Sequence, residues 1–280
     1  FKPLRPDQMS YWQNYKKFFV SFQKSMWGEA ATAENDFAYD WLPKLDVPGY
    51  DLLRAFELMH QGKMNGYICQ GFNPLLSAPN RKKCTEALSK LKFLVTMDPL
   101  ETETARFWED HGEYNDVDPS QIQTEVIQLP STCFAEDDGS LVSSSRWLQW
   151  HWAAGTPVGE AKRDTWIMAQ IWKRLKALYE KEGGPLPDPI VNLHWPYADP
   201  DDPKADEIAR ELNGYAIEAV YDPTDPTKVL VEKGKQLASF GQCRDDGTTS
   251  VGCWIYTGCF TEDGNNMARR DNTDPDDTGA

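Results

Sequence analysis

Three short apolar segments separated by helical patterns constrain the fold of this chain most strongly. They cover residues 66–70, 93–97 and 125–129, and each has the length of a buried β-strand. Each ends at a polar or turn-forming break, and stretches with helical spacing of apolar residues lie between and around them. This alternation is typical of βαβ units. It predicts a Rossmann-like α/β fold: a parallel sheet with flanking helices and loop-rich additions at both ends.

Apolar residues at helical spacing predict four helices around these strands. The first follows Asp51 and ends near Gly62, and the second follows Asn80, where a polar side chain is suited to cap it. A short helix is expected over 102–110. The strongest pattern predicts a helix over 165–181, where seven apolar residues share one face.

Composition divides the chain into three expected segments. Residues 1–49 are aromatic-rich and irregular, with a short helix, and 50–184 carry the α/β pattern. Residues 185–280 read as a loop-rich extension, because Pro and Asp are frequent and periodicity is weak. Within this extension we expect a hairpin in 216–232 and a solvated, disordered end over 271–280.

The polar breaks after the strands indicate where a ligand would bind. In open parallel sheets, ligands bind beyond the carboxyl ends of the strands. The segments 71–74, 98–104 and 129–139 follow the three strands directly. We therefore expect them to meet at one edge of the sheet.

Each candidate residue at this edge has a functional and a purely structural interpretation. Gly71 permits a close backbone approach to a ligand, and Asn73 and Pro74 continue the same loop, yet all three also suit a plain turn. Asp98 is suited to accept hydrogen bonds from a ribose or a guanine, or to begin a turn before Pro. Thr102 could contact a phosphate or cap the next helix. The loop is neither a Walker sequence nor GxGxxG, which argues against ATP and NAD.

Two further acidic positions carry the same ambiguity. Asp164 precedes the strongest helix, so it suits an N-cap. Its carboxylate could also read guanine, because it accepts from both N–H donors of that base, but taken in isolation the position favours the cap. Asp137 lies in an acidic turn over 136–139, which is also what a solvated hairpin would contain.

Composition excludes several other classes of function. The formal net charge is −15, and such a surface repels phosphate backbones, so no nucleic-acid partner is expected. No pair of the six cysteines has CxxC spacing, so neither zinc nor an iron–sulfur cluster is indicated; Cys253 and Cys259 could pair, but buried thiols are the simpler expectation. The four histidines are scattered. No apolar run approaches 20 residues, so we expect no direct membrane insertion.

Taken together, the motifs resemble the molybdopterin oxidoreductases, and most fully the large subunit of respiratory, membrane-associated formate dehydrogenases. The motifs that carry the resemblance occur in the family's order: Gly71-Phe72-Asn73-Pro74, Met97-Asp98-Pro99-Leu100-Glu101-Thr102-Glu103-Thr104-Ala105, Leu129-Pro130-Ser131-Thr132, Phe134-Ala135-Glu136-Asp137-Asp138-Gly139, Ser145-Arg146-Trp147 and Gly159-Glu160-Ala161 with Asp164. Similar stretches extend over nearly the whole chain.

The resemblance implies a domain that cradles molybdopterin guanine dinucleotide. In the parent enzyme two such dinucleotides hold molybdenum or tungsten, formate is oxidised to CO2, and electrons pass to iron–sulfur clusters. By matching, Gly71, Asn73 and Pro74 line the cofactor, and Met97 and Asp98 hold its nucleoside half. Thr102 belongs to the second of these motifs. Asp164 matches the family's guanine-contacting acid.

One position departs from the family, and several family features have no counterpart. Asp137 stands where the family often has a lysine contact. The metal-ligating selenocysteine or cysteine, its neighbouring His and Arg, and the cluster cysteines would lie upstream of residue 1, and the family's C-terminal cofactor-binding domain would lie downstream of residue 280. We therefore expect the chain to be catalytically inert alone.

The resemblance also implies partners and a location. It implies the remaining domains of the same subunit, iron–sulfur and membrane cytochrome subunits, and a periplasmic parent complex. Two alternatives stay open: the same domain from a sister molybdoenzyme with another substrate, and a non-catalytic interaction or scaffold module.

Overall fold

The chain was analysed as a computed structural model that describes residues 11–44, 49–109, 116–144 and 147–269. It divides into two compact units. One unit contains residues 44–137 and 153–168, and the other contains 1–43, 138–152 and 169–280. The predicted segments 1–49, 50–184 and 185–280 stay a prediction.

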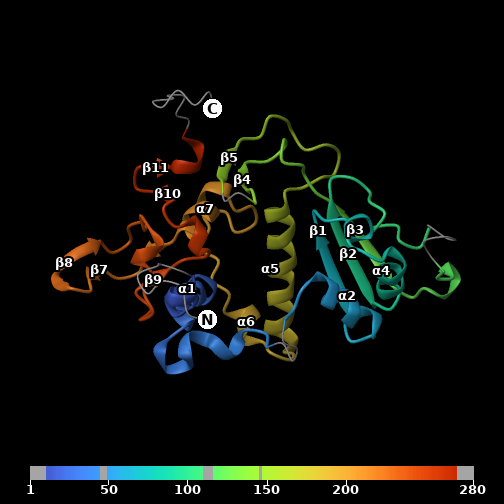
Figure 1. The fold of residues 1–280 in the computed structure, drawn as a ribbon, viewed down its shortest axis with the longest axis horizontal. Helices are drawn as coiled ribbons and strands as arrows, with labels where there is room; N and C mark the ends of the chain where they lie inside the picture. Colours follow the sequence, from blue (N-terminus) through green and yellow to red (C-terminus); the bar gives the residue numbers. More distant parts are fainter. Residues whose placement is uncertain (1–10, 45–48, 110–115, 145–146, 270–280) are drawn as a thin grey trace. The chain divides into compact units, whose positions relative to one another are not determined.

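The unit of residues 44–137 and 153–168 is built on the three-stranded parallel sheet that the sequence predicts. Its strands are β1 (Gly66–Gln70), β2 (Phe93–Asp98) and β3 (Glu125–Pro130), in the order β1-β2-β3 (Figure 1). Gln70 lies opposite Met97, and Asp98 opposite Pro130. The carboxyl ends of all three strands therefore meet at one edge, and the predicted α/β class is confirmed.

Helices cover one face of this sheet. They are α2 (Leu52–His60), α3 (Pro74–Ser77) and α4 (Arg81–Leu88). Asp51 caps α2 by accepting the Arg54 N–H at 2.7 Å, and Asn80 caps α4 by accepting the Lys83 N–H at 3.2 Å, which confirms both expected helix starts. The shared core is fully apolar: Phe56, Met59, Leu88, Leu94 and Phe107 are each at most 2% exposed. On the other face, Ile68 and Ile127 remain about half exposed.

The helix expected over 102–110 is wrong, since residues 103–108 form successive turns and not a helix. The backbone makes i→i+3 bonds, from Ala105 to Thr102 and from Glu109 to Arg106. Side chains explain the difference, because the Thr104 hydroxyl is bound by Asn73 in another loop. The connection between β2 and β3 therefore contains no α-helix in its described residues, only the 3₁₀ turn η3 (Pro119–Gln121).

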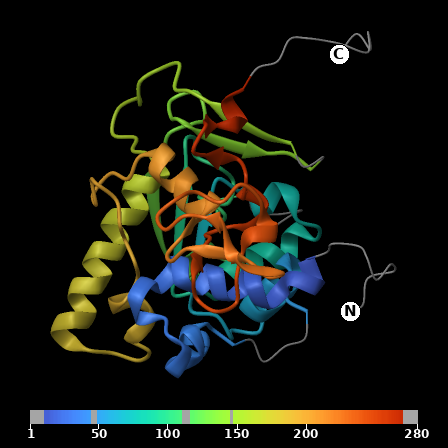
Figure 2. The same cartoon turned by 90° about the vertical axis from the view of Figure 1, so that its left-hand side faces the viewer.

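The other unit combines helices with small antiparallel sheets. Its first element is α1 (Tyr11–Trp27), a helix of 17 residues where only a short helix was expected. α1 lies beside β9 (Thr249–Ser250) in both views (Figures 1 and 2): the Val251 N–H donates to the Ser21 carbonyl, and the hydroxyls of Ser21 and Thr249 are 2.7 Å apart. Phe18 and Tyr11 of α1 thus belong to a packed core, with Phe18 stacked on Trp254.

The predicted hairpin is confirmed as β7 (Val220–Asp222) and β8 (Asp225–Val231), which pair antiparallel. The predicted helix over 165–181 is confirmed as α5 (Asp164–Glu182).

The remaining elements are η1 (Gly28–Ala30), η2 (Ala33–Trp41), β4 (Gly139–Val142), β5 (Leu148–His151), α6 (Asp188–Val191), α7 (Ala205–Asn213), β6 (Tyr215–Ala216), η4 (Phe240–Gln242), η5 (Trp254–Tyr256), β10 (Phe260–Thr261), β11 (Gly264–Asn265) and η6 (Asn266–Ala268). Among the described helices, none has the length and apolar character needed to cross a bilayer. The expected disordered end at 271–280 lies outside the described residues.

A matched pair of leucines tests the core beneath the sheet. Leu94 is fully buried in β2, whereas Leu76 in α3 is 70% exposed. We expect Leu94→Ala to lower the free energy of unfolding by about 2–5 kcal/mol, because it removes buried methyl groups and leaves a cavity. Leu76→Ala should change it by about 0.5 kcal/mol or less. Denaturant titration of both variants measures the difference; equal effects would contradict this description of the core.

Candidate functional site

The candidate site is the edge where the three parallel strands end. Gly71 follows β1 with a positive φ of 57°, and its N–H donates to the Met97 carbonyl at 2.8 Å. A Cβ added to Gly71 would meet no atom within 4 Å, so open space adjoins this turn. At β3, the Lys162 N–H donates to the Pro130 carbonyl at 3.1 Å. This bond brings residue 162, and with it the start of α5, to the same edge.

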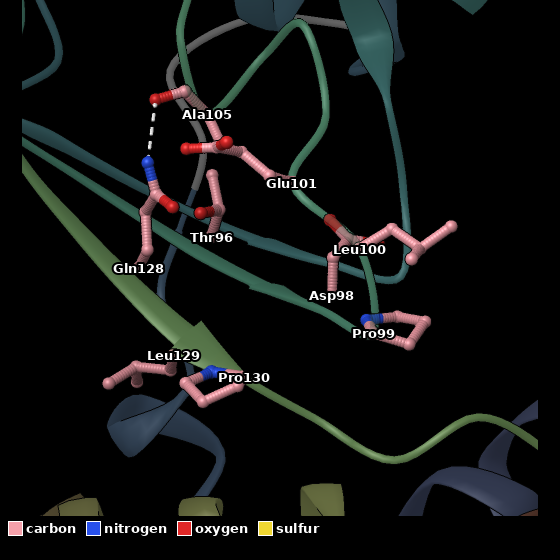
Figure 3. Close-up of a pocket in the computed structure, with 9 residues that line it drawn as sticks. All are labelled: Thr96, Asp98, Pro99, Leu100, Glu101, Ala105, Gln128, Leu129 and Pro130. Atoms are coloured by element: carbon pink, nitrogen blue, oxygen red, sulfur yellow. Dashed lines mark hydrogen bonds between the residues drawn. The ribbon is translucent and has the colours of Figure 1, made fainter. Parts of the chain in front are cut away.

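A cavity of about 290 Å³ opens between the ends of β2 and β3 and the loop that follows β2 (Figure 3). Figure 3 shows Gln128 reaching across to the loop, where its amide donates to the Ala105 carbonyl at 3.3 Å. The residues that line this cavity are Thr96, Asp98, Pro99, Leu100, Glu101, Ala105, Gln128, Leu129 and Pro130. The predicted ligand edge thus contains an actual hollow.

Asn73 joins the first loop of the edge to the second. Its side-chain carbonyl accepts the hydroxyl of Thr104 at 2.8 Å, and its amide N–H donates to Glu103 at 2.5 Å. The Thr104 oxygen in turn accepts the Leu75 N–H at 3.3 Å, and Thr104 is fully buried. Pro74, also buried, begins α3 beside this clamp. The amide of Asn73 therefore holds the two loops in register.

Asp164 reaches the edge through Gln70, the last residue of β1. The Gln70 amide donates to Asp164 Oδ2 at 2.8 Å, between residues 94 positions apart. Asp164 is the first residue of α5, and its carboxylate binds the Gln70 side chain. Its other oxygen, Oδ1, is buried and has no hydrogen-bond partner.

Three candidate residues leave a buried polar atom unpartnered at this edge. They are Asp98 through Oδ2, Thr102 through Oγ1 and Asp164 through Oδ1. Leaving such an atom unsatisfied costs about 1–3 kcal/mol, so folded proteins rarely keep several of them together. Three acceptors concentrated here are suited to a ligand that presents N–H or O–H donors.

The two carboxylates also affect each other electrostatically. Burial, and then the charge of Asp164, raises the pKa of Asp98 above its usual value. Burial also raises the pKa of the nearby Cys69 thiol to about 11, so this cysteine is protonated at neutral pH and is not an activated nucleophile. Cys69 therefore supplies no thiolate nucleophile to this edge at neutral pH.

The remaining predicted positions have different environments. Asp137 forms a salt bridge with Arg163, at 3.7 Å from its guanidinium. Arg163 directly precedes Asp164 in the chain. The Met97 side chain is fully buried in β2. Its backbone carbonyl is the group that reaches the edge, where it accepts the Gly71 N–H. All six cysteines are free thiols, and in the described parts of the chain no three His, Cys, Asp or Glu side chains come together as a metal-ligating group.

The comparisons with known proteins decide the family. No family model matches the chain. It is 56% identical over 278 residues to the formate dehydrogenase-O major subunit of Escherichia coli, a match that covers 99% of this chain and 27% of that subunit. Over nearly its whole length the chain is therefore similar to formate dehydrogenase large subunits, which are molybdopterin oxidoreductases. It is also 38% identical over 281 residues to the formate dehydrogenase subunit alpha of Megalodesulfovibrio gigas, again over 99% of this chain and 27% of the relative.

More distant molybdopterin oxidoreductases match a smaller part of the chain. A nitrate reductase of Klebsiella oxytoca is 26% identical over 130 residues, which is 46% of this chain. The chain spans about a quarter of the length of the formate dehydrogenase subunits that it matches. It therefore corresponds to one part of a much longer molybdopterin oxidoreductase subunit.

Residue patterns alone missed two contributors to the site. Gln70 was expected only as the last residue of a strand, and Glu103 only as part of a helix. A polar side chain at the end of an otherwise apolar strand was the available signal for Gln70, because such a residue projects into the ligand edge. Nothing in the sequence pattern indicated that Glu103 binds Asn73.

Asp98→Asn tests the electrostatic cost of the paired carboxylates. The raised pKa means that the ionised form destabilises the fold; this cost is absent below the usual pKa of 3.8 and present once pH rises above the folded-state value. At pH 7 we expect the variant to have a Tm higher than wild type by about 2 °C or less, because Asp98 is only partly buried and solvent screens part of the effect. The gain should shrink as pH falls through the folded-state pKa of Asp98, because the wild-type carboxyl then becomes neutral as well.

Thermal unfolding of both proteins between pH 3.5 and 8 measures this effect. Asp51→Asn serves as control, because Asp51 is exposed and caps α2, so its loss should not raise the Tm. A gain for Asp98→Asn that is the same at every pH would rule out charge as the cause.

Proposed function

We propose that this chain binds the guanine half of a molybdopterin guanine dinucleotide at the strand-end edge. The observation that carries the proposal is the convergence of unpartnered acceptors on Asp98, Thr102 and Asp164, which come from separate segments of the chain. Guanine presents an imino and an amino donor side by side, whereas adenine presents one amino donor beside an acceptor. Carboxylates without donors of their own therefore favour guanine.

The other edge residues complete the proposed cradle. Gly71, whose Cβ position is open space, would allow the cofactor to approach the backbone, and Asn73 and Pro74 would hold that loop in place. The carbonyl of Met97 fixes Gly71, and the pair of Asp137 with Arg163 would adjoin the polar part of the ligand. We place this cofactor-binding part within residues 50–184, with 1–49 and 185–280 as additions.

The parent enzyme is proposed to be a formate dehydrogenase. When bound in its bis form, the cofactor carries molybdenum or tungsten and supplies the two-electron oxidation of formate to CO2. The residues of this chain bind and orient that group, since redox chemistry belongs to the cofactor. The level of identity to formate dehydrogenase subunits supports this substrate over nitrate, for which identity is 26% over less than half of the chain.

The parent would also work with other proteins. One relative, 39% identical, is named for cytochrome c-553, and another, 54% identical, is called nitrate-inducible. These names support a respiratory complex. In it, electrons would pass from the cofactor through the rest of the subunit to an iron–sulfur subunit, and then to a membrane cytochrome subunit. We propose that this complex faces the periplasm.

Nucleotide titration tests the guanine site directly. We expect the purified chain to bind GDP more tightly than ADP, because only guanine offers two adjacent donors to the carboxylates. Asp164→Ala should reduce this preference by about tenfold or more, the value of a hydrogen bond to a charged group. Isothermal calorimetry measures both affinities.

The matched control is Asp51→Ala, which removes an N-terminal helix carboxylate far from the edge in sequence. It should lower stability by about 1 kcal/mol and leave the GDP preference intact. Equal affinity of the wild-type chain for GDP and ADP would refute the guanine site and favour an interaction module that has lost cofactor binding.

A second expected outcome concerns activity. In the described ranges the His, Cys, Asp and Glu side chains form no metal-ligating cluster, and the redox chemistry belongs to the proposed cofactor. We therefore expect the purified chain to show no formate-dependent reduction of a viologen dye. Turnover above a no-enzyme blank by homogeneous protein would overturn this expectation.

A further inference from the structure

A cavity of about 300 Å³ lies within the unit that contains α1 and α7. α7 lines it with Glu207, Arg210 and Glu211, whose spacing of three and four positions places them on one helix face. Tyr215 and Ser250, which pair with each other between β6 and β9, line it from the sheet. A volume of this size is at the lower end of the range for small-molecule sites. Regular secondary structure therefore holds much of the cavity wall.

The buried hydroxyl of Ser250 points to a ligand. Ser250 is 1% exposed, and its Oγ is buried without a hydrogen-bond partner. Ser21, another buried serine of this unit, differs: its hydroxyl lies 2.7 Å from that of Thr249 and donates to the Arg244 carbonyl at 3.1 Å. A buried hydroxyl without a partner lowers the stability of the folded chain, so folded proteins rarely keep one. A hydroxyl in a cavity wall acquires its partner when a polar molecule binds.

The two carboxylates of the wall are already occupied by donors of the chain itself. Glu207 accepts two backbone N–H groups, those of Ala198 at 3.1 Å and Lys204 at 3.4 Å. Glu211 accepts the hydroxyl of a serine in α1 at 2.8 Å, and its other oxygen accepts the hydroxyl of Tyr197, which also lines the cavity. Neither acid is therefore the group that a ligand would engage first.

The donors of the wall, by contrast, are available. Four side chains that line the cavity make no hydrogen bond to any residue that the structure describes: His194, Arg210, Tyr215 and Ser250. The guanidinium of Arg210 is nevertheless held in place, 4.8 Å from the centroid of the Phe260 ring, and such a cation–π contact leaves its N–H groups free. Phe260 is 5% exposed and its N–H donates to Asn213 Oδ1 at 3.0 Å, so the ring beneath Arg210 is itself fixed.

We propose that this cavity binds the carboxylate of a small organic acid, with Arg210 as the charged donor and Tyr215 and Ser250 as neutral donors. A guanidinium matches a carboxylate geometrically, because two parallel N–H groups meet its two oxygens. The rings of Tyr197 and Tyr215 supply apolar surface for the body of the acid. The site belongs to a different unit from the strand-end edge and does not depend on the guanine site.

The charges of the wall favour a monoanion over a dianion. Arg210 supplies a positive charge, and Glu207 and Glu211 supply two negative charges on the same helix face. A phosphate dianion is repelled by these carboxylates more strongly than a singly charged carboxylate is. The formal net charge of −15 for the whole chain acts in the same direction. The wall thus selects an acid with a single negative charge.

Calorimetric titration of the purified chain with benzoate, benzamide and phosphate tests the class of ligand. We expect benzoate to bind about tenfold or more tightly than benzamide, because only benzoate presents a charge to the guanidinium. Phosphate should bind more weakly than benzoate. The proposal is overturned if benzoate at up to about 10 mM does not bind. Equal affinities for benzoate and benzamide, or tighter binding of phosphate, would overturn it as well.

Arg210→Gln tests the charged donor. We expect this variant to bind benzoate about tenfold or more weakly than wild type, because it loses a hydrogen bond between charged groups. The control is Arg174→Gln on α5, an arginine of the same unit whose guanidinium donates to the Gln170 carbonyl at 3.2 Å. The control should bind benzoate as wild type does, and both variants should keep the wild-type Tm. Unchanged affinity in Arg210→Gln would show that the acid does not bind there.

Ser250→Ala tests the buried hydroxyl through two readouts of opposite sign. Without ligand we expect it to raise the Tm by about 2 °C, because it removes a buried polar atom that has no partner. It should also weaken benzoate binding by about fivefold. Ser21→Ala is the matched control: it removes a hydroxyl that has partners, so it should lower the Tm and leave the benzoate affinity unchanged. A lower Tm with unchanged affinity in Ser250→Ala would overturn the role assigned to Ser250.

Discussion

The parallel pairing of β1, β2 and β3 is the constraint on which the candidate site depends. Parallel neighbours require a long crossover between strands, and they bring all carboxyl ends to one edge. The ladder from Gln70–Met97 to Asp98–Pro130 fixes where each following loop begins. Gly71, Asp98 and Pro130 are adjacent for that reason, although the chain between them covers several turns and helices.

The edge keeps polar groups that a purely structural unit would satisfy. The core beneath the sheet is apolar, and the caps of α2 and α4 are complete, so the local folding signals agree with one another. Among the described residues of the sheet unit, the buried carboxylate and hydroxyl oxygens that lack partners lie at the strand ends, whereas in the other unit the hydroxyls of Ser250 and Thr257 also lack them. Such a local departure from an otherwise consistent fold is what a binding site for a donor-rich ligand requires.

Much of the sheet unit follows from sequence patterns, because each strand is a short run rich in apolar residues and both α2 and α4 begin after a cap residue. The three strands, the starts of α2 and α4, and the helix α5 agree with those patterns. The turns over 103–108 do not, because Thr104 and Glu103 are held by Asn73, about thirty residues earlier. Periodicity describes local preference, and it contains no information about such distant side-chain bonds.

Some features of the candidate residues were predictable from the sequence, and others depend on contacts between distant segments. Asp98 was identifiable from its position after a strand, and Asp164 from its resemblance to the family's acid. That Asp164 uses one oxygen for Gln70 could not be predicted, because the two residues are 94 positions apart and belong to no shared motif. Likewise, the pairing of Asp137 with Arg163 depends on a fold that brings an acidic turn to the start of α5.

The distance along the chain between Gln70 and Asp164 has a consequence for biosynthesis. A ribosome that adds about 5–20 residues per second needs roughly 5–20 s to make the intervening 94 residues. During this interval the sheet and its helices can form, because β1, β2 and β3 lie before residue 131. The nascent chain can then hold a folded sheet while the proposed pocket is still unfinished, because Asp164 has yet to emerge.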